Sequence, residues 1–152
     1  MSYKSNRLLT KMIRRISKND REQYVELLCQ FRPVQKSDIT QKQFETFVEG
    51  AQQRGEIFVF EREGQILSAV TAMLEQKLIH GMAIYCHIED VIVHETSRGN
   101  GIGKRMMQHV TSWAKEQGCY KSVLNCSNDI KHFYISSGFE ERGVSMSFWR
   151  PK

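Results

Sequence analysis

The fold is decided by one stretch near the middle of the chain, Val91-Ile92-Val93-His94-Glu95-Thr96-Ser97-Arg98-Gly99-Asn100-Gly101-Ile102-Gly103-Lys104. Its first three residues are β-branched and predict a strand, its glycines predict a turn, and the residues after them predict the start of a helix. The first N–H groups of a helix have no partner within the helix, and glycines let an anion approach them closely. The stretch therefore predicts an anion-binding turn, with a plain glycine turn as the alternative. Its spacing matches neither the P-loop nor the dinucleotide signature, so it gives little support for ATP or NAD.

Hydrophobic spacing on both sides of this stretch predicts alternating helices and strands. After a strand at 11–16, a first helix is capped by Asn19 or Asp20 and ends at Arg32-Pro33, and a second begins with a capping box at Thr40–Gln43. Their apolar faces are predicted to consist of Tyr24, Leu27, Leu28 and Phe31 and of Phe44, Phe47, Val48 and Ala51. Strands are predicted at 57–60, 66–74, 87–93, 121–125 and 144–149, and further helices at 103–117 and 129–137. This order predicts a mixed α/β (α+β) domain with a central sheet.

Length and charge narrow the class of protein. The 152 residues carry 22 Lys and Arg against 17 Asp and Glu, and six of the basic residues lie in the acid-free segment 1–19. We expect a single domain over 1–152, with 1–10 as a flexible basic arm. Because the rest of the chain is balanced in charge, a nucleic-acid-binding body is not expected, and no apolar run is long enough for a membrane-spanning helix. We expect a cytoplasmic protein, and the basic arm leaves organellar import open as an alternative.

The sequence gives no sign of a metal site. The four cysteines are scattered without C-x-x-C spacing, which predicts reduced and mostly buried thiols. His87 and Glu89 lie two residues apart on one strand face, which is typical of a hydrogen-bonded pair in a sheet. We therefore expect no metal.

Four motifs follow one another along the chain: His87-Ile-Glu-Asp90, Arg98-x-x-Gly101-x-Gly103, Gly118-Cys-Tyr-Lys121 and Phe133-Tyr134-x-x-x-Gly138-Phe139. In this order and spacing they resemble the glucosamine 6-phosphate N-acetyltransferase family of the GNAT superfamily, over residues 12–150. The resemblance implies the GNAT fold, a mixed central sheet with a splayed strand pair flanked by helices. It implies a homodimer that transfers the acetyl group of acetyl-CoA to the amine of D-glucosamine 6-phosphate. The product would be N-acetylglucosamine 6-phosphate, on the way to UDP-N-acetylglucosamine.

The resemblance also implies which residues hold acetyl-CoA. The last strand residues before the glycine turn would bind the pantetheine arm and polarise the thioester carbonyl, and the turn would hold the pyrophosphate. Phe133 and Tyr134 would complete the donor site. The expected set is Asp90, Val91, Ile92, Val93, Arg98, Gly99, Asn100, Gly101, Ile102, Gly103, Lys104, Arg105, Phe133 and Tyr134.

Three residues are expected at the reacting atoms. Tyr134 matches the family tyrosine that serves the leaving thiolate, with a core aromatic as the alternative. Asn125 stands where the family has an acid, and a neutral amide does not accept a proton at working pH. We therefore expect the Asn125 backbone carbonyl to orient the amine and Glu89 or water to relay the proton. The alternative is that Asn125 only caps the end of its strand.

The sugar phosphate requires cationic and polar groups. Family-like positions are occupied by Lys77, Leu78, Ile79, His80, Gly81, Glu89, Asp90, Lys121, Ser122 and Arg150. The family has a phosphate-binding arginine in its last strand, reached across the dimer, where this chain has Trp149 with Arg150 one residue later. Two other functions stay open: acetylation of another amine (an amino sugar, a polyamine or a peptide) and a non-catalytic acyl-CoA-binding module.

Overall fold

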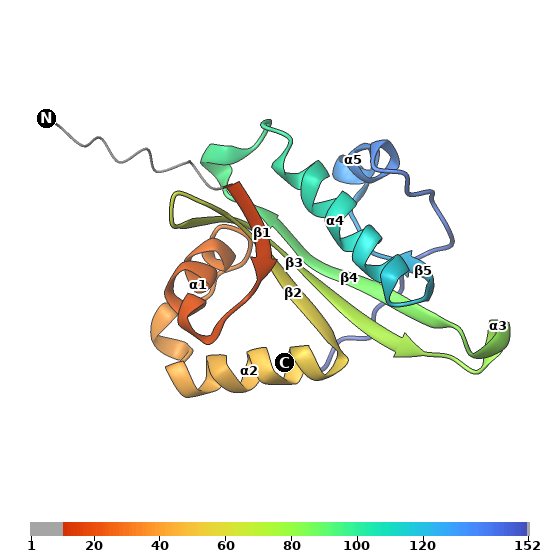
Figure 1. Cartoon of the computed structure of the whole chain (residues 1–152), viewed down its shortest axis with the longest axis horizontal. Coiled ribbons are helices and arrows are strands. Elements are labelled where there is room, and N and C mark those ends of the chain that lie inside the picture. Colours follow the sequence, from red (N-terminus) through yellow and green to blue (C-terminus); the bar gives the residue numbers. More distant parts are fainter. Residues whose placement is uncertain (1–10, 152) are drawn as a thin grey trace, which may run out of the picture.

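The computed structural model describes residues 11–151, so the expected basic arm at 1–10 lies outside the described residues. Five strands form a sheet in chain order: β1 (Lys11–Arg15), β2 (Gly55–Arg62), β3 (Gln65–Gln76), β4 (Ile84–Val93) and β5 (Cys119–Val123). The strands β1 to β4 pair with one another in antiparallel fashion, whereas β4 and β5 are parallel. The predicted mixed α/β class with a central sheet is confirmed, as Figure 1 shows.

Helices cover the two faces of this sheet. One face carries α1 (Arg21–Cys29) and α2 (Gln41–Arg54), and the other carries α4 (Ile102–Glu116) and α5 (Lys131–Ser136) (Figure 1). Side chains alternate between the faces along each strand, so Phe58 and Phe60 of β2 join the α4 core while Ile57 and Val59 join the α1–α2 core. A short turn labelled α3 (Ile79–Met82) connects β3 to β4 at the tip of the sheet.

Local sequence explains most helix ends. Thr40 and Gln43 form the predicted capping box at the start of α2, each side chain bonding the backbone N–H of the other residue. Gly118, with φ +76°, follows α4 as predicted. Asp20 stands at the N-cap of α1, but its carboxylate does not cap the helix because it binds Arg14 and the Ser17 N–H instead.

The predicted strand at 144–149 is wrong. Residues 139–151 contain no helix or strand, and Val144, Met146, Phe148 and Trp149 are each at least 84% exposed. A strand needs a neighbouring strand for its backbone hydrogen bonds, and no described strand of this chain pairs with this tail. The alternating apolar side chains of the tail are therefore left without a surface to cover them.

Other differences are smaller. β5 begins and ends two residues before the predicted strand at 121–125, and the predicted helix at 129–137 is a 3₁₀ turn at Asn128–Ile130 followed by α5. Phe31 and Phe47 are half exposed, although both were predicted on apolar helix faces. Cys29 and Cys126 are exposed, so the thiols are not mostly buried. Within residues 11–151, no helix is both long and apolar enough to cross a membrane.

Candidate functional site

The candidate site begins where β4 and β5 separate. Their parallel pairing runs from Ile84 with Cys119 to His87 with Val123, where β5 ends. β4 continues to Val93, so within the described residues its edge toward β5 is unpaired from Ile88 onward. The unpaired N–H and C=O groups of this edge are available to a ligand, as expected for a splayed strand pair.

A β-bulge shapes that edge. Thr71 of β3 pairs with Glu89 and Ala69 pairs with Ile92, so β4 has one extra residue between these pairs. Asp90, in the bulge, has φ +48°, a left-handed conformation that Asp tolerates better than most residues. The bulge turns the backbone of Asp90 and Val91 away from the regular ladder and leaves it at the open edge.

The glycine turn leads from β4 into α4. Gly101 is the N-cap residue of α4 and has φ +75°. The first N–H of the helix to bond back is that of Arg105, which donates to the Gly101 carbonyl oxygen. The N–H groups of Ile102, Gly103 and Lys104 therefore precede the ladder, and they point outward along the positive end of the helix dipole. This arrangement is typical of a phosphate site.

Two predicted donor-site residues lie against each other. Gly103 faces the ring of Phe133 so closely that a Cβ atom on Gly103 would lie 3.1 Å from Phe133 Cζ. The same atom would lie 3.5 Å from Val93 Cγ2. The absence of a side chain at Gly103 thus lets the end of β4, the start of α4 and α5 pack together.

The three cations predicted at the turn have different surroundings. The Arg98 Nε donates to the Val93 carbonyl oxygen at 3.1 Å, which holds this side chain beside the end of β4. Lys104 is exposed. The Arg105 guanidinium lies 5.3 Å from the centroid of the Phe60 ring, so β2 sets its position. Arg98 and Lys104 are therefore the side chains that add positive charge at the turn itself.

Tyr134 lies on α5 and is 7% exposed. Its ring packs edge-on against Phe133 at 4.9 Å and Phe139 at 6.1 Å between centroids, as part of the α4 core. Burial, and then the nearby Cys126 thiol, raise the pKa of Tyr134 above the ordinary tyrosine value. The hydroxyl therefore stays protonated at neutral pH, as a proton donor requires, and the ring also fills the core.

A second cluster lies at the far end of the sheet, near α3. Glu75 binds both Lys77 and His87, with 2.5 Å between the paired atoms in each case. These bonds, that of Lys77 first, lower the pKa of the Glu75 carboxyl. Lys77 and Lys121 both lie over the ring of Tyr85, at 5.3 and 4.7 Å from its centroid.

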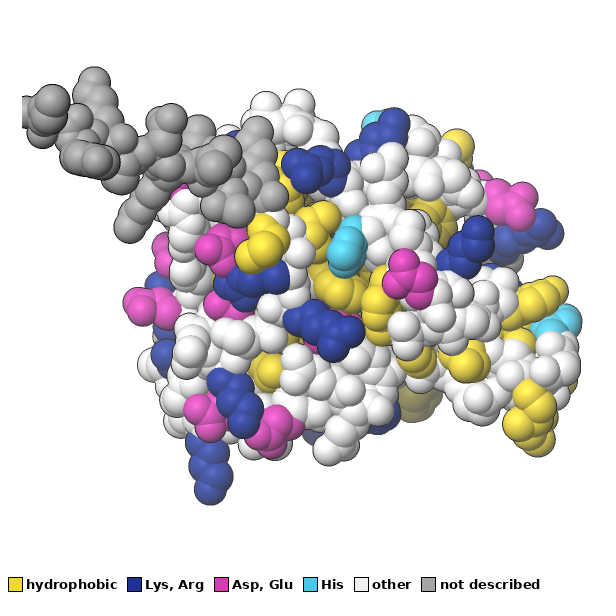
Figure 2. Space-filling view, in the orientation of Figure 1, with side chains coloured by type: hydrophobic (Ala, Val, Ile, Leu, Met, Phe, Trp, Pro, Cys, Tyr) yellow, Lys and Arg dark blue, Asp and Glu magenta, His cyan; other side chains and the backbone are white. Residues whose placement is uncertain are grey.

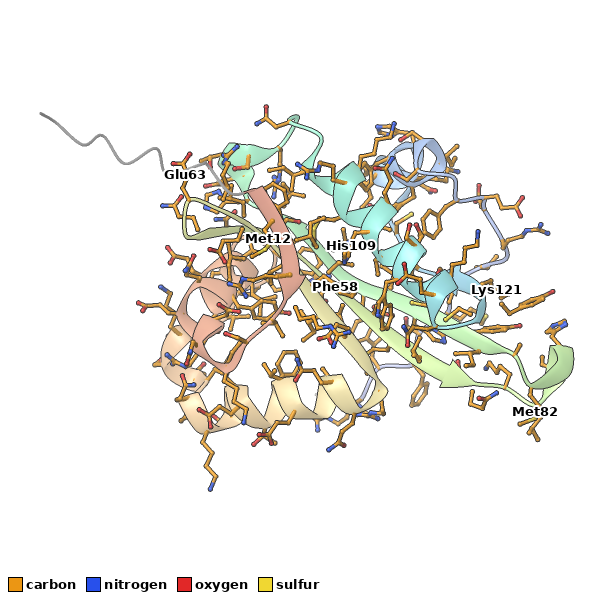
Figure 3. The ribbon with its side chains drawn as sticks, in the orientation of Figure 1. Met12, Phe58, Glu63, Met82, His109 and Lys121 are labelled. Atoms are coloured by element: carbon orange, nitrogen blue, oxygen red, sulfur yellow. The ribbon has the colours of Figure 1, made fainter. Side chains whose placement is uncertain are left out.

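The two lysines of this cluster differ in their partners. Lys77 is neutralised by Glu75, whereas Lys121 forms no ion pair with a carboxylate of residues 11–151. Figure 3 shows Lys121 on β5, at the same end of the sheet as Met82 of the α3 turn. His80 stacks on Tyr120 with 4.7 Å between ring centroids, which places an imidazole beside the same cluster. Lys121 is thus the cation available for an anionic ligand.

The remaining predicted residues are not all brought together. Ser122 pairs with Cys86 in the ladder and shares its face, the α4 side, whereas Lys121 faces Tyr85 on the opposite side. Asn125 is exposed, two residues beyond β5, and Arg150 lies in the exposed tail. Leu78, Ile79, His80 and Gly81 are exposed in the α3 turn.

Sequence reasoning missed Glu75 and Tyr85, and the predicted partnership of His87 with Glu89 is wrong. His87 bonds Glu75, which the β3–β4 pairing brings to the same face. The available signal was the hairpin itself, since long side chains at diagonal positions on one face of two paired strands can reach each other. The described residues hold no group of three or more His, Cys, Asp or Glu arranged for a metal ion.

Residues 21–139 match the sequence model of the acetyltransferase (GNAT) family. A glucosamine 6-phosphate N-acetyltransferase of Arabidopsis thaliana is 32% identical over 141 residues, covering 89% of this chain and 93% of that protein. A probable glucosamine 6-phosphate N-acetyltransferase 2 of Oryza sativa is 37% identical over 87 residues, and the match covers 57% of this chain. The chain spans about half, 52%, of that rice relative.

Solved structures agree with the sequence comparison. The crystal structure of glucosamine-6-phosphate N-acetyltransferase from Arabidopsis thaliana superposes with a TM-score of 0.86 at 30% identity, covering 92% of this chain and 98% of that one. An aminoglycoside N-acetyltransferase in complex with CoA, at 19% identity and a TM-score of 0.75, shares the fold. The chain therefore belongs to the acetyltransferase (GNAT) family.

Proposed function

We propose that this chain, as one domain, transfers the acetyl group of acetyl-CoA to the amine of D-glucosamine 6-phosphate. The observation that carries this proposal is the bulged, unpaired edge of β4, which leads through the turn at residues 94–101 into the amide-lined start of α4. Support also comes from relatives named glucosamine 6-phosphate N-acetyltransferase and from a structural neighbour described in complex with CoA.

The donor side consists of two backbone surfaces. The three N–H groups before Arg105, with Arg98 and Lys104, would hold the pyrophosphate of acetyl-CoA. The open edge of β4 from Ile88 to Val93 would bind the amide groups of the pantetheine arm, as a strand does at a sheet edge. The thioester would then lie beside the bulge, where backbone N–H groups meet the carbonyl oxygen.

The reaction needs little covalent chemistry from the protein. The amine nitrogen attacks the thioester carbon, a C–N bond forms, and the C–S bond breaks with its electron pair passing to sulfur. The bulge N–H groups stabilise the negative charge on the carbonyl oxygen. Tyr134 donates its proton to the thiolate, and the amine loses a proton to Glu89 or to water.

On the acceptor side, the sugar phosphate would bind at the cluster near α3. Lys121 would contact the phosphate because its charge is not already paired, and Lys77, which also lies over the Tyr85 ring, would support it. His80 would contribute a further hydrogen-bond donor or acceptor from the α3 turn. Ser122, on the opposite face, would lie outside this group.

The exposed tail favours a homodimer. Val144, Met146 and Phe148 alternate with Ser145 and Ser147, and all three apolar residues are at least 89% exposed. Leu78, Ile79 and Met82 are also exposed in the α3 turn, where Figure 2 shows apolar side chains on the surface. A second copy would cover such apolar surface, and its tail would bring Arg150 to the phosphate. The cytoplasmic location stays a prediction.

A panel of acceptors tests this function. Release of free CoA is measured with acetyl-CoA and, in turn, glucosamine 6-phosphate, glucosamine, a polyamine and a lysine peptide. Release with glucosamine 6-phosphate alone supports the proposal. Faster release with another amine would identify that amine as the acceptor in place of glucosamine 6-phosphate. Binding of acetyl-CoA without CoA release for any amine would indicate a non-catalytic module.

A further inference from the structure

Three side chains stand in a row across the sheet, at the end that carries the α3 turn. Glu75 of β3 pairs with Tyr85 of β4, and Tyr85 pairs with Lys121 of β5. Residues that oppose each other on neighbouring strands point to the same face, so Tyr85 stands between a carboxylate and an ammonium group. The backbones of β3 and β5 are two strand spacings apart, about 10 Å, which a glutamate and a lysine side chain together can bridge. Tyr85 therefore occupies the place where Glu75 and Lys121 would otherwise meet.

The Lys121 ammonium lies over this ring instead. Its Nζ atom is 4.7 Å from the centroid of Tyr85, within the range of a cation–π interaction. The two carboxylate oxygens of Glu75 are occupied by other residues, since Oε1 binds Lys77 and Oε2 binds His87. The charge of Lys121 is thus held by an aromatic face, which leaves it open to an anionic ligand.

An aromatic stack of His80, Tyr120 and Tyr85 sets the orientation of that ring. Tyr120 stacks on Tyr85 with 6.0 Å between ring centroids and 17° between ring planes, and His80 stacks on Tyr120 at 4.7 Å and 8°. The register of the β4–β5 ladder shifts between Ile84 and Tyr85, so Tyr120 is an extra residue in β5. This irregularity lets Tyr120 and Lys121 reach the same ring, although successive residues of a regular strand point to opposite faces.

The α3 turn is fixed against this stack. His80 and Met82 have φ of +54° and +64°, left-handed conformations that persist only where the surroundings enforce them. The stacking of His80 on Tyr120 supplies one restraint. Gln76 supplies another, because its Nε2 atom donates to the Met82 carbonyl oxygen at 2.7 Å. The turn therefore supports Tyr120, and through it the ring over which the Lys121 ammonium lies.

We propose that Tyr85 is a positioning residue for the acceptor phosphate: it holds the Lys121 ammonium over its ring and away from Glu75. Lys121 is then directed before the sugar phosphate arrives, and binding requires no internal ion pair to be broken. This role rests on the proposed function, because the sugar phosphate is the anion that Lys121 would bind. Tyr85 acts through Lys121 and does not itself contact the substrate.

Steady-state kinetics of the full chain measures this effect on the acceptor. Tyr85→Leu removes the ring and should raise the KM of glucosamine 6-phosphate about 3–30-fold, the factor that corresponds to the strength of a cation–π contact. The kcat and the KM of acetyl-CoA should stay near the wild-type values, because the donor site is unchanged. Tyr85→Phe keeps the ring and should keep the low KM. Phe31→Leu is the matched control, since it removes a ring whose centroid lies 5.2 Å from Cζ of Arg32, outside the site.

A double-mutant cycle with Glu75→Gln tests whether Tyr85 separates Lys121 from Glu75. In the Tyr85→Leu background Lys121 can pair with Glu75, so Glu75→Gln should restore much of the lost affinity for the sugar phosphate. We expect Glu75→Gln to lower the KM of glucosamine 6-phosphate at least threefold more in this background than in the wild type. Equal effects of Glu75→Gln in the two backgrounds would overturn the separation of the two charges by Tyr85.

Proton NMR reports the position of the lysine without any reaction. An aromatic ring shifts protons that lie over its face upfield. The Hε signal of Lys121 should therefore lie upfield in the wild type and in Tyr85→Phe, and should move to the ordinary lysine position in Tyr85→Leu. Lys121→Ala assigns the signal, because it removes it.

The outcomes distinguish this role from the proposed function. An Hε signal of Lys121 that Tyr85→Leu leaves in place overturns the positioning role. An unchanged KM of glucosamine 6-phosphate in Tyr85→Leu also overturns it, and so does an equal rise in Tyr85→Phe. If the wild type acetylates no amine, the proposed function fails. The Hε signal, together with calorimetric titration of glucosamine 6-phosphate into the wild type and Tyr85→Leu, then still decides whether Tyr85 holds Lys121 for a phosphate.

Discussion

His87 and Val123 form the last pair that joins β4 to β5. Beyond this pair the edge of β4 toward β5 is unpaired for six residues, while its other edge stays on β3; the strand passes through the bulge at Asp90 and ends at Val93, before the glycine turn and α4. The same short segment therefore carries an unpaired strand edge, a bulge and a helix start. In the proposed function, the helix start holds the pyrophosphate of acetyl-CoA, and the backbone of the bulged strand edge polarises its thioester.

Gly101 tests the anion site. Gly101→Val forces a β-branched residue into φ +75°, a strain of about 1–2 kcal/mol. We expect the affinity for CoA, measured by calorimetric titration, to fall about 5–30-fold in a folded protein. Gly50→Ala in α2, where nothing lies within 4 Å, is the control and should leave CoA affinity unchanged. Equal CoA affinity of the wild type and of Gly101→Val would show that the glycine turn does not bind CoA. Gly103→Val also changes packing on Phe133, so it is the less specific test.

Tyr134→Phe tests the proton donor. We expect kcat to fall by about 10–1000-fold with little change in the KM of the sugar phosphate, because the hydroxyl acts as charge develops on sulfur. The pKa of Tyr134 is raised, so the protonated donor is present through neutral pH and is lost only as pH rises beyond the ordinary tyrosine value of 10.0. A kcat that stays at the wild-type value, with chemistry rate-limiting, would reduce Tyr134 to core packing.

Lys121 tests the phosphate site. Lys121→Ala should raise the KM of glucosamine 6-phosphate about 10–100-fold and change that of acetyl-CoA far less, because a charge-assisted contact is lost only on the acceptor side. Lys77→Ala should have a smaller effect, since Lys77 is already neutralised by Glu75. Lys115→Ala, exposed on α4, is the control for loss of one positive charge. Equal effects of Lys121→Ala on the KM values of both substrates would show that Lys121 does not bind the phosphate of the sugar.

The tail tests the dimer. A double variant, Met146→Asp with Phe148→Asp, should sediment as a monomer and bind the sugar phosphate weakly, while it still binds CoA. Phe31→Asp is the control: it places a negative charge on a half-exposed phenylalanine that is distant in sequence from the tail, and this variant should remain dimeric. A wild-type protein that is monomeric and active at micromolar concentration would contradict the shared site.

Asn125 and Glu89 test the fate of the amine proton. Asn125→Ala keeps the backbone carbonyl and should retain most of the activity. Glu89→Gln removes a proton acceptor and should lower kcat more. Both side chains are exposed, so neither substitution disturbs the core. An inactive Asn125→Ala protein that folds and binds acetyl-CoA would make the side chain itself the catalytic group.

The central part of the fold follows from local sequence. The β-branched residues before Arg98 form the end of β4, and the helical spacing of Met106, Met107 and Val110 forms the buried face of α4. These signals are strong because each lies within one element. The glycines mark the turn for the same reason.

The rest depends on partners that are distant in sequence. The Glu75–His87 pair exists because the β3–β4 register brings the two side chains together. The bulge at Asp90 has no clear local signal, since Asp accepts a left-handed conformation but does not demand it. Val144, Met146 and Phe148 alternate like a strand, yet a strand forms only beside another strand.

Carbon-13 NMR of the reaction measures the proposed transfer most directly. Acetyl-CoA labelled at the acetyl carbonyl is mixed with glucosamine 6-phosphate and the purified protein. We predict that the thioester signal is replaced by the amide signal of N-acetylglucosamine 6-phosphate, with one CoA released for each amide formed. A thioester signal that persists while acetyl-CoA is bound would contradict acetyl transfer to this sugar.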